Sequence, residues 1–120
     1  MIGYIIKERV IEMLNVQKIN LDGYEFLTYE VCLPKTTLLV VTNEIGYIMC
    51  AALDIDFFNA TPKLIEREII AGRAEGVRTI EQLLEAPLAK ITIAAEALGI
   101  EPGVTTGKEA LVIMAKSAEK

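Results

Sequence analysis

Residues 16–33 read VQKINLDGYEFLTYEVCL, and the strongest structural signal in the chain lies here. Residues 16–21 alternate between apolar and polar side chains, which is the period of a strand with one buried face. Asp22 and Gly23 follow as the residue pair that favours a type I′ turn. Residues 24–33 are rich in aromatic and β-branched side chains, which favour a second strand. The stretch therefore predicts a β-hairpin.

The residues around the hairpin extend the sheet. Pro34 ends the second strand because it has no N–H to donate to a ladder. Residues 38–41 predict a buried strand, residues 43–46 a turn, and residues 47–52 another strand. The first half of the chain is thus expected to be mostly antiparallel sheet. Before the hairpin, apolar residues between 2 and 14 recur at helical spacing, and both an amphipathic helix and a strand fit them.

The second predicted strand of the hairpin is apolar on both of its sides, so both faces should be buried. Hydrophobic residues also make up 52% of a chain of only 120 residues, which is more than a small domain can bury alone. We therefore expect a second copy of the chain to press against the sheet. The residues of the strand are Leu27, Tyr29, Val31 and Leu33 on one side and Tyr24, Phe26 and Cys32 on the other.

After residue 53 the signals change from strands to helices. Side chains that cap helix N-termini recur, and residues 68–71 read as one short strand between helices. Ile91, Ala94, Ala95 and Leu98 fit one helical face that ends before Gly99. We expect one domain over residues 1–120, an α+β two-layer sandwich in which C-terminal helices cover a largely antiparallel sheet. The helix-start signals are Asp54, Thr61 with Pro62, Thr79 with Gln82, and Thr106 with Glu109.

Charge and composition exclude several classes of function. The net charge of -5 and the scattered basic residues argue against a nucleic-acid partner. No apolar run approaches the roughly 20 residues of a membrane span, and the N-terminus lacks the pattern of a signal peptide. The chain has no histidine and no CxxC pair, so no metal site or disulfide is indicated, and the sequence leaves the cofactor unknown. We therefore expect a protein of the reducing cytoplasm.

The loop between the short strand and the helix after Thr79 is the candidate binding site. Gly72 and Gly76 allow the backbone N–H groups to turn toward an anion, and Arg73 and Arg78 add charged donors. The N-terminus of the helix contributes partial positive charge. A phosphate, sulfate or carboxylate would suit such a loop. The competing interpretation is a turn whose arginines form structural ion pairs with nearby carboxylates.

Cys50 and Asp54 flank a strand-to-helix junction, where a thiol could meet a helix N-terminus that lowers its pKa. This predicts, as an alternative function, an enzyme with Cys50 as nucleophile acting on an acidic substrate. A plain core role for the cysteine competes with it, because no histidine is present to act as a base. A scaffold subunit of a larger complex is the third interpretation.

Three stretches together resemble the YunC-like family of uncharacterised bacterial and archaeal proteins. They are GYIMCAALD at 46–54, AGRAEGVRTIEQLLEAPL at 71–88 and AAEALGIEPGVTTGKEAL at 94–111. The resemblance implies a small α+β domain whose N-terminal β region mediates tetramerisation, and it implies no activity. Residues 1–12 precede the usual start of the family, and residues 59–62 depart from its pattern. The combined prediction is a cytoplasmic homotetramer with a small-anion site at the loop.

Overall fold

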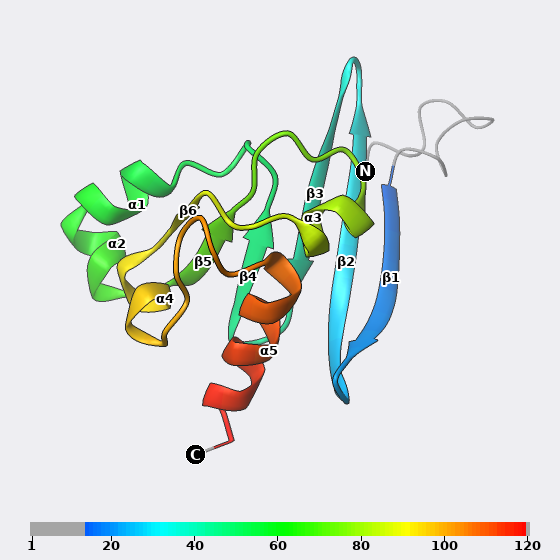
Figure 1. Ribbon diagram of the computed structural model, residues 1–120. Helices are drawn as coiled ribbons and strands as arrows, with labels where there is room; N and C mark the ends of the chain where they lie inside the picture. Colours follow the sequence, from blue (N-terminus) through cyan, green and yellow to red (C-terminus); the bar gives the residue numbers. More distant parts are fainter. Residues whose placement is uncertain (1–13, 120) are drawn as a thin grey trace.

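The computed structural model describes residues 14–119, so the helix or strand expected before residue 13 lies outside the described residues (Figure 1). Residues 14–119 form a six-stranded sheet with the order β1-β2-β3-β4-β5-β6. All neighbouring strands are antiparallel except β4 and β5, which are parallel. The elements are β1 (Leu14–Leu21), β2 (Tyr24–Leu33), β3 (Thr36–Thr42), β4 (Gly46–Met49), α1 (Ile55–Ala60), α2 (Pro62–Glu66), β5 (Ile70–Arg73), α3 (Ile80–Glu85), β6 (Lys90–Ile91), α4 (Ile93–Ala97) and α5 (Gly107–Ser117).

The predicted hairpin is present as β1 and β2, with Leu21 opposite Tyr24 across the turn. Asp22 and Gly23 have φ of 53° and 88°, the two positive values that a type I′ turn requires. The Asn20 side chain strengthens the turn, since its Oδ1 accepts a hydrogen bond of 3.0 Å from the Gly23 N–H. A second two-residue turn follows β2, where Lys35 has φ of 66° after Pro34.

The main core lies between the sheet and the helices α3 and α5, which confirms the predicted α+β sandwich (Figure 1). We call this side of the sheet the inner face. Its strands contribute Phe26, Leu39 and Ile48, and the helices contribute Leu83 and Leu111, each nearly or fully buried. The two helices lie very close where α3 ends and α5 begins, since the Gly107 N–H donates to the Ala86 carbonyl at 3.0 Å.

The opposite side of the sheet, the outer face, is covered only in part. Ile55 of α1 is buried with Leu53 and Ala71 in a second apolar cluster, which Tyr47 and Met49 of β4 border. Ala71 pairs with Tyr47 in the β4–β5 register, so this cluster lies on the outer face. The helices therefore cover most of the inner face, apart from the exposed residues Asn15, Gln17 and Cys32, but only the β4–β5 end of the outer face.

Several predicted elements shift by a few residues. The helix expected to begin at Ile91 begins at Ile93, because Lys90 and Ile91 pair with β5 as the short strand β6. The short strand expected at 68–71 is found at 70–73. Thr79 accepts from the Gln82 N–H as predicted, but the Gln82 Oε1 accepts at 2.7 Å from the Arg78 N–H instead of from Thr79. Thr106 and Glu109 form the complete capping box that their spacing predicts.

Candidate functional site

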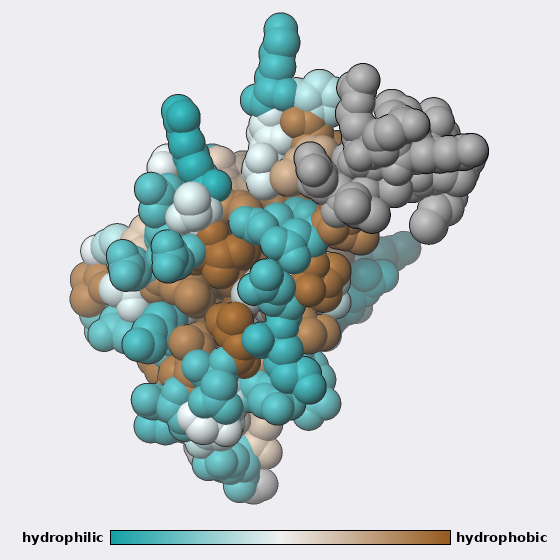
Figure 2. Space-filling model, turned by 90° about the vertical axis from the view of Figure 1, so that its right-hand side faces the viewer, coloured by the Kyte–Doolittle hydropathy of each residue, from teal (hydrophilic) through white to brown (hydrophobic). Residues whose placement is uncertain are grey.

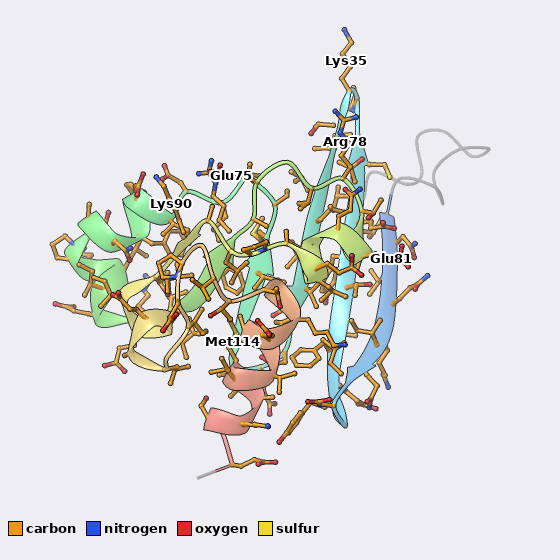
Figure 3. All side chains as sticks on the ribbon, in the orientation of Figure 1. Lys35, Glu75, Arg78, Glu81, Lys90 and Met114 are labelled. Atoms are coloured by element: carbon orange, nitrogen blue, oxygen red, sulfur yellow. The ribbon has the colours of Figure 1, made fainter. Side chains whose placement is uncertain are left out.

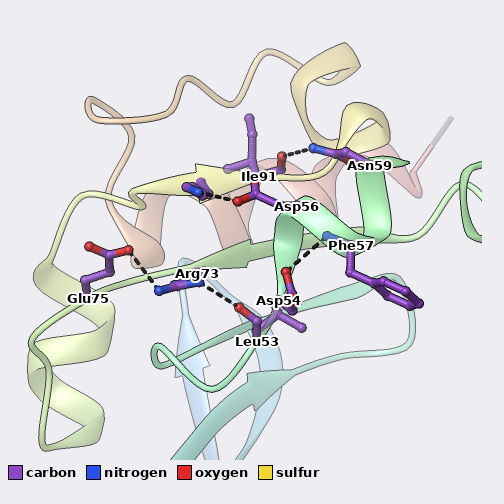
Figure 4. A network of polar contacts seen from close by, with 9 residues as sticks. Leu53, Asp54, Asp56, Phe57, Asn59, Arg73, Glu75 and Ile91 are labelled. Atoms are coloured by element: carbon purple, nitrogen blue, oxygen red, sulfur yellow. Dashed lines mark hydrogen bonds and ion pairs between the residues drawn. The ribbon is translucent and has the colours of Figure 1, made fainter. Parts of the chain in front are cut away.

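Arg73 occupies the end of β5 at the start of the predicted anion loop (Figure 4). Its Nη1 donates to the Leu53 carbonyl at 3.3 Å, and its Nη2 pairs with Glu75 Oε2 at 3.1 Å. The Nε atom is buried and has no hydrogen-bond partner among the residues that the structure describes. The Arg73 side chain is 24% exposed, so it is only partly buried. The arginine thus joins the loop to the segment before α1.

The carboxylates around Arg73 are already used by the protein (Figure 4). Asp54 caps α1, since its Oδ1 accepts from the Phe57 N–H at 3.0 Å, as its position in the sequence predicted. Asp56 pairs with Lys90 Nζ at 2.6 Å, although both side chains are largely exposed. No cluster of metal-ligating side chains is found among residues 14–119. The region is an ion-pair network at the junction of α1, β5 and β6.

The other loop residues serve different local needs. A Cβ on Gly72 would lie 2.6 Å from Leu88 Cδ1, so the glycine here allows close packing in β5. Gly76 has φ of 74° and open space around it, which fits a turn that requires a left-handed backbone conformation. Arg78 is exposed, and Figure 3 shows it toward the β2–β3 turn that Lys35 marks. Glu75, the partner of Arg73, lies well away from Arg78 in that view.

Cys50 lies in the main core and is only 7% exposed. Its Sγ accepts a long hydrogen bond of 3.5 Å from the Leu39 N–H. Asp54 is exposed at the surface and its carboxylate caps α1, so the structure does not join the thiol and this carboxylate in one cleft. The geometry places Cys50 as a packing residue. Cys32 is also a free thiol and is exposed.

The outer face over β1, β2 and β3 is open in the single chain. Most side chains at its outward positions are apolar and partly or largely exposed; the polar ones are Lys18, Asn20, Glu25, Thr36 and Thr42. Figure 2 shows apolar side chains in gaps between hydrophilic ones on the side of the molecule that β1 borders. Partial burial raises the pKa of Tyr47 above its ordinary value at the covered end of the same face. The most exposed apolar side chains of the outer face are Leu14 at 51%, Val16 at 47%, Leu33 at 39% and Leu27 at 38%.

Toward the β2–β3 turn, the inner face carries exposed polar side chains, while the outer face is apolar. Asn15 and Glu30 face each other on the inner side, where their side chains share a hydrogen bond of 3.0 Å. Leu14 and Val31 occupy the adjacent pair on the outer side. A sheet that turned this outer face to water would be expected to carry polar residues there. Of the apolar positions predicted for the second hairpin strand, Leu27, Tyr29, Val31 and Leu33 therefore lie on an uncovered surface, whereas Phe26 lies in the main core.

Sequence reasoning found the loop and its arginines but missed their partners. The Leu53 carbonyl, which Arg73 binds, lies 20 positions away in the chain, and Asp56 lies 34 positions from Lys90. Neither pairing has a local signal, because only the parallel β4–β5 connection brings these segments together. Within residues 14–119 no helix is long and apolar enough to cross a membrane.

Comparison with known proteins gives three consistent similarities. The model of the family DUF1805, described as a domain of unknown function, matches residues 49–114. The uncharacterized protein YunC of Bacillus subtilis (strain 168) is 53% identical over 104 residues, which cover 87% of this chain and all of that protein. The crystal structure of a protein of unknown function from Thermoplasma acidophilum superposes with a TM-score of 0.66 at 27% identity. That match covers 76% of this chain and 83% of that one.

Proposed function

This chain belongs to the DUF1805 family of domains of unknown function, and from its own surface we propose that it is a homo-oligomer assembled through the outer face of β1–β3. The YunC-like resemblance implies a tetramer, which we adopt as the proposed state. In this proposal the open sheet of one copy packs against that of another. Both cysteines are free, which suits the reducing cytoplasm that we propose for the protein.

The observation that carries the proposal is the apolar, uncovered outer face of the hairpin. Asn15 and Glu30 are polar where the sheet turns toward the helix side, while Val16 and Tyr29 are apolar where it turns away. Burying apolar surface contributes roughly 25 cal/mol per Å², so covering these side chains favours association. Lys18 and Glu25 form a weak, exposed ion pair of 4.0 Å near the hairpin turn, a polar border that suits the rim of an interface.

Light scattering after size-exclusion chromatography tests this proposal. The wild-type protein should have a mass near four times the 13.2 kDa of the chain. Leu27→Glu should give smaller species, because a carboxylate buried in an apolar interface costs several kcal/mol. The matched control is Val104→Glu, since Val104 is 65% exposed but lies outside the sheet. A monomeric wild-type protein, or an equal loss of mass in both variants, would refute the proposal.

A second candidate function is favoured by one observation, the buried Arg73 Nε without a partner among the described residues. We propose that a small anion such as phosphate binds at this guanidinium and displaces Glu75 from it. Inorganic phosphate should then raise the thermal midpoint, and Glu75→Gln should increase the shift by removing the competing carboxylate. Arg78→Ala is the control, because Arg78 lies apart from Glu75 (Figure 3). If Glu75→Gln leaves the phosphate effect unchanged, Arg73 is a structural residue only.

A further inference from the structure

A groove separate from both proposed sites lies among α1, α2, α4 and the start of β5. Its cavity has a volume of about 410 Å³, within the usual size range of small-ligand pockets. We call it the α1–α4 groove. It lies at the β5–β6 side of the sheet, whereas the outer face proposed for assembly lies over β1–β3. Its apolar lining includes Phe58, Leu64, Ile65, Ile69, Ile93 and Leu98.

The walls of the groove are held together by polar side chains whose hydrogen bonds are already made. Asn59 Nδ2 donates to the Ile91 carbonyl at 3.1 Å, and Asn59 Oδ1 accepts from the Ile93 N–H at 3.0 Å. Thr92 Oγ1 accepts from the Ala71 and Ala95 N–H groups at 3.1 and 3.3 Å. These bonds fix α1 and α4 relative to β5, so a ligand would find the groove formed in advance.

The apolar side chains of the groove remain exposed to an unusual degree. Ile65 on α2 is 40% exposed and Ile93 on α4 is 49% exposed. A ligand with an apolar body would remove this surface from water, and about 0.8 kcal/mol per buried methylene corresponds to roughly fourfold in affinity. The polar atoms of Asn59 and Thr92 are committed, so they offer a polar ligand little. The body of a ligand should therefore be hydrocarbon.

Charge selects the head group of that ligand. Glu68 is the single charged residue that lines the groove. Its carboxylate forms no ion pair with any residue between 14 and 119, unlike Asp56 and Glu75. An anionic head group would be repelled and a cationic one attracted. We propose that the α1–α4 groove binds small amphipathic amines, molecules with a short hydrocarbon chain and one ammonium group.

Calorimetric titration with simple probes tests this proposal on the full chain. Octylamine should bind about threefold more tightly than 1-octanol, the advantage expected for one exposed ion pair, and octanoate should bind more weakly than either. Shortening the amine to hexylamine should weaken binding by about fifteenfold, as expected for two buried methylenes at roughly fourfold each. Absence of octylamine binding, or equal binding of amine and carboxylate, would overturn the proposal.

Two pairs of variants locate the binding. Glu68→Gln should abolish the preference for octylamine over 1-octanol, while Glu66→Gln, on α2 but outside the lining, should preserve it. Ala97→Leu places a side chain into the groove and should remove octylamine binding, while Ala60→Leu, exposed and outside the lining, should not. Undiminished binding in Ala97→Leu would overturn the proposal. A change of oligomeric state in that variant would also overturn it, because a second copy would then occupy the groove.

Discussion

Gly107 is a position where one added methyl group should be costly, and no local sequence signal reveals it. The residue opens α5 directly after its capping threonine and is buried. A Cβ built at this position would lie 2.4 Å from the Leu83 carbonyl oxygen and 2.7 Å from Ile48 Cδ1. The Ile48 methyl can move, but the Leu83 oxygen belongs to the backbone of α3. Gly107→Ala must therefore push α3 and α5 apart.

The size of the effect follows from two opposing contributions. Inserting a methyl group into a tightly packed contact costs about 1–3 kcal/mol. Alanine is better than glycine within a helix by up to about 1 kcal/mol, and by less at the first helical residue. We expect Gly107→Ala to lower the free energy of unfolding by about 1–2 kcal/mol. For a domain of this size the thermal midpoint should fall by roughly 4–8 °C.

Thermal and urea denaturation of a substitution series provides the test. Stability should decrease in the order Gly107, Gly107→Ala, Gly107→Val, because each step needs more space between the helices. Gly103 is the control, since it has φ of 78° and nothing within 4 Å of an added Cβ. At that position only backbone strain matters, so Gly103→Asn should be less destabilising than Gly103→Ala. If Gly107→Ala is as stable as the wild type, the close contact between α3 and α5 is wrong.

Three further predictions concern other local features. Thr106→Ala should cost about 1 kcal/mol in urea denaturation, because Thr106 caps α5 in a complete box, whereas Thr61→Ala should cost less, because Thr61 makes no cap bond at α2. Lys35→Gly should stabilise the chain by about 0.5 kcal/mol, because the relief of left-handed backbone strain exceeds the entropy cost of the more flexible glycine. An unchanged urea midpoint would contradict this. The hydrogen bond from Tyr24 to Glu119 raises the pKa of Tyr24 above its ordinary value of 10.0, so its contribution to stability is present below pH 10 and is lost as the pH rises further. Glu119→Gln should lower the pKa of Tyr24 in a spectrophotometric titration, and no change would exclude Glu119 as the cause.

The hairpin and the helix starts could be predicted because their signals are local. Asp22 and Gly23 are adjacent residues that form a turn, and Thr106 and Glu109 form a helix cap within four consecutive residues. The strand β6 could not be predicted, because two residues become a strand only through pairing with β5. The same holds for α1, whose caps were visible but whose position on the outer face depends on Ala71.

The candidate site was predictable in position but not in its chemistry. Arg73 was found from a glycine-rich loop, yet its partners come from the segment before α1 and from the loop itself. Cys50 reads as a possible nucleophile from its neighbours, and only the packing of β3 against β4 places its sulfur in the core. The proposed groove had no sequence signal, since its apolar residues belong to four separate segments.

The order of elements along the chain has a consequence for synthesis. Phe26, Leu39 and Ile48 form the inner face of the sheet, but Leu111 and Met114, which cover it, follow roughly 60 residues after the last of them. At translation rates of about 5–20 residues per second, the nascent sheet waits roughly 3–12 s for α5. During that interval, apolar side chains on both faces of the sheet remain exposed to water. The chain should therefore aggregate most readily, and bind chaperones most readily, while it is being synthesised.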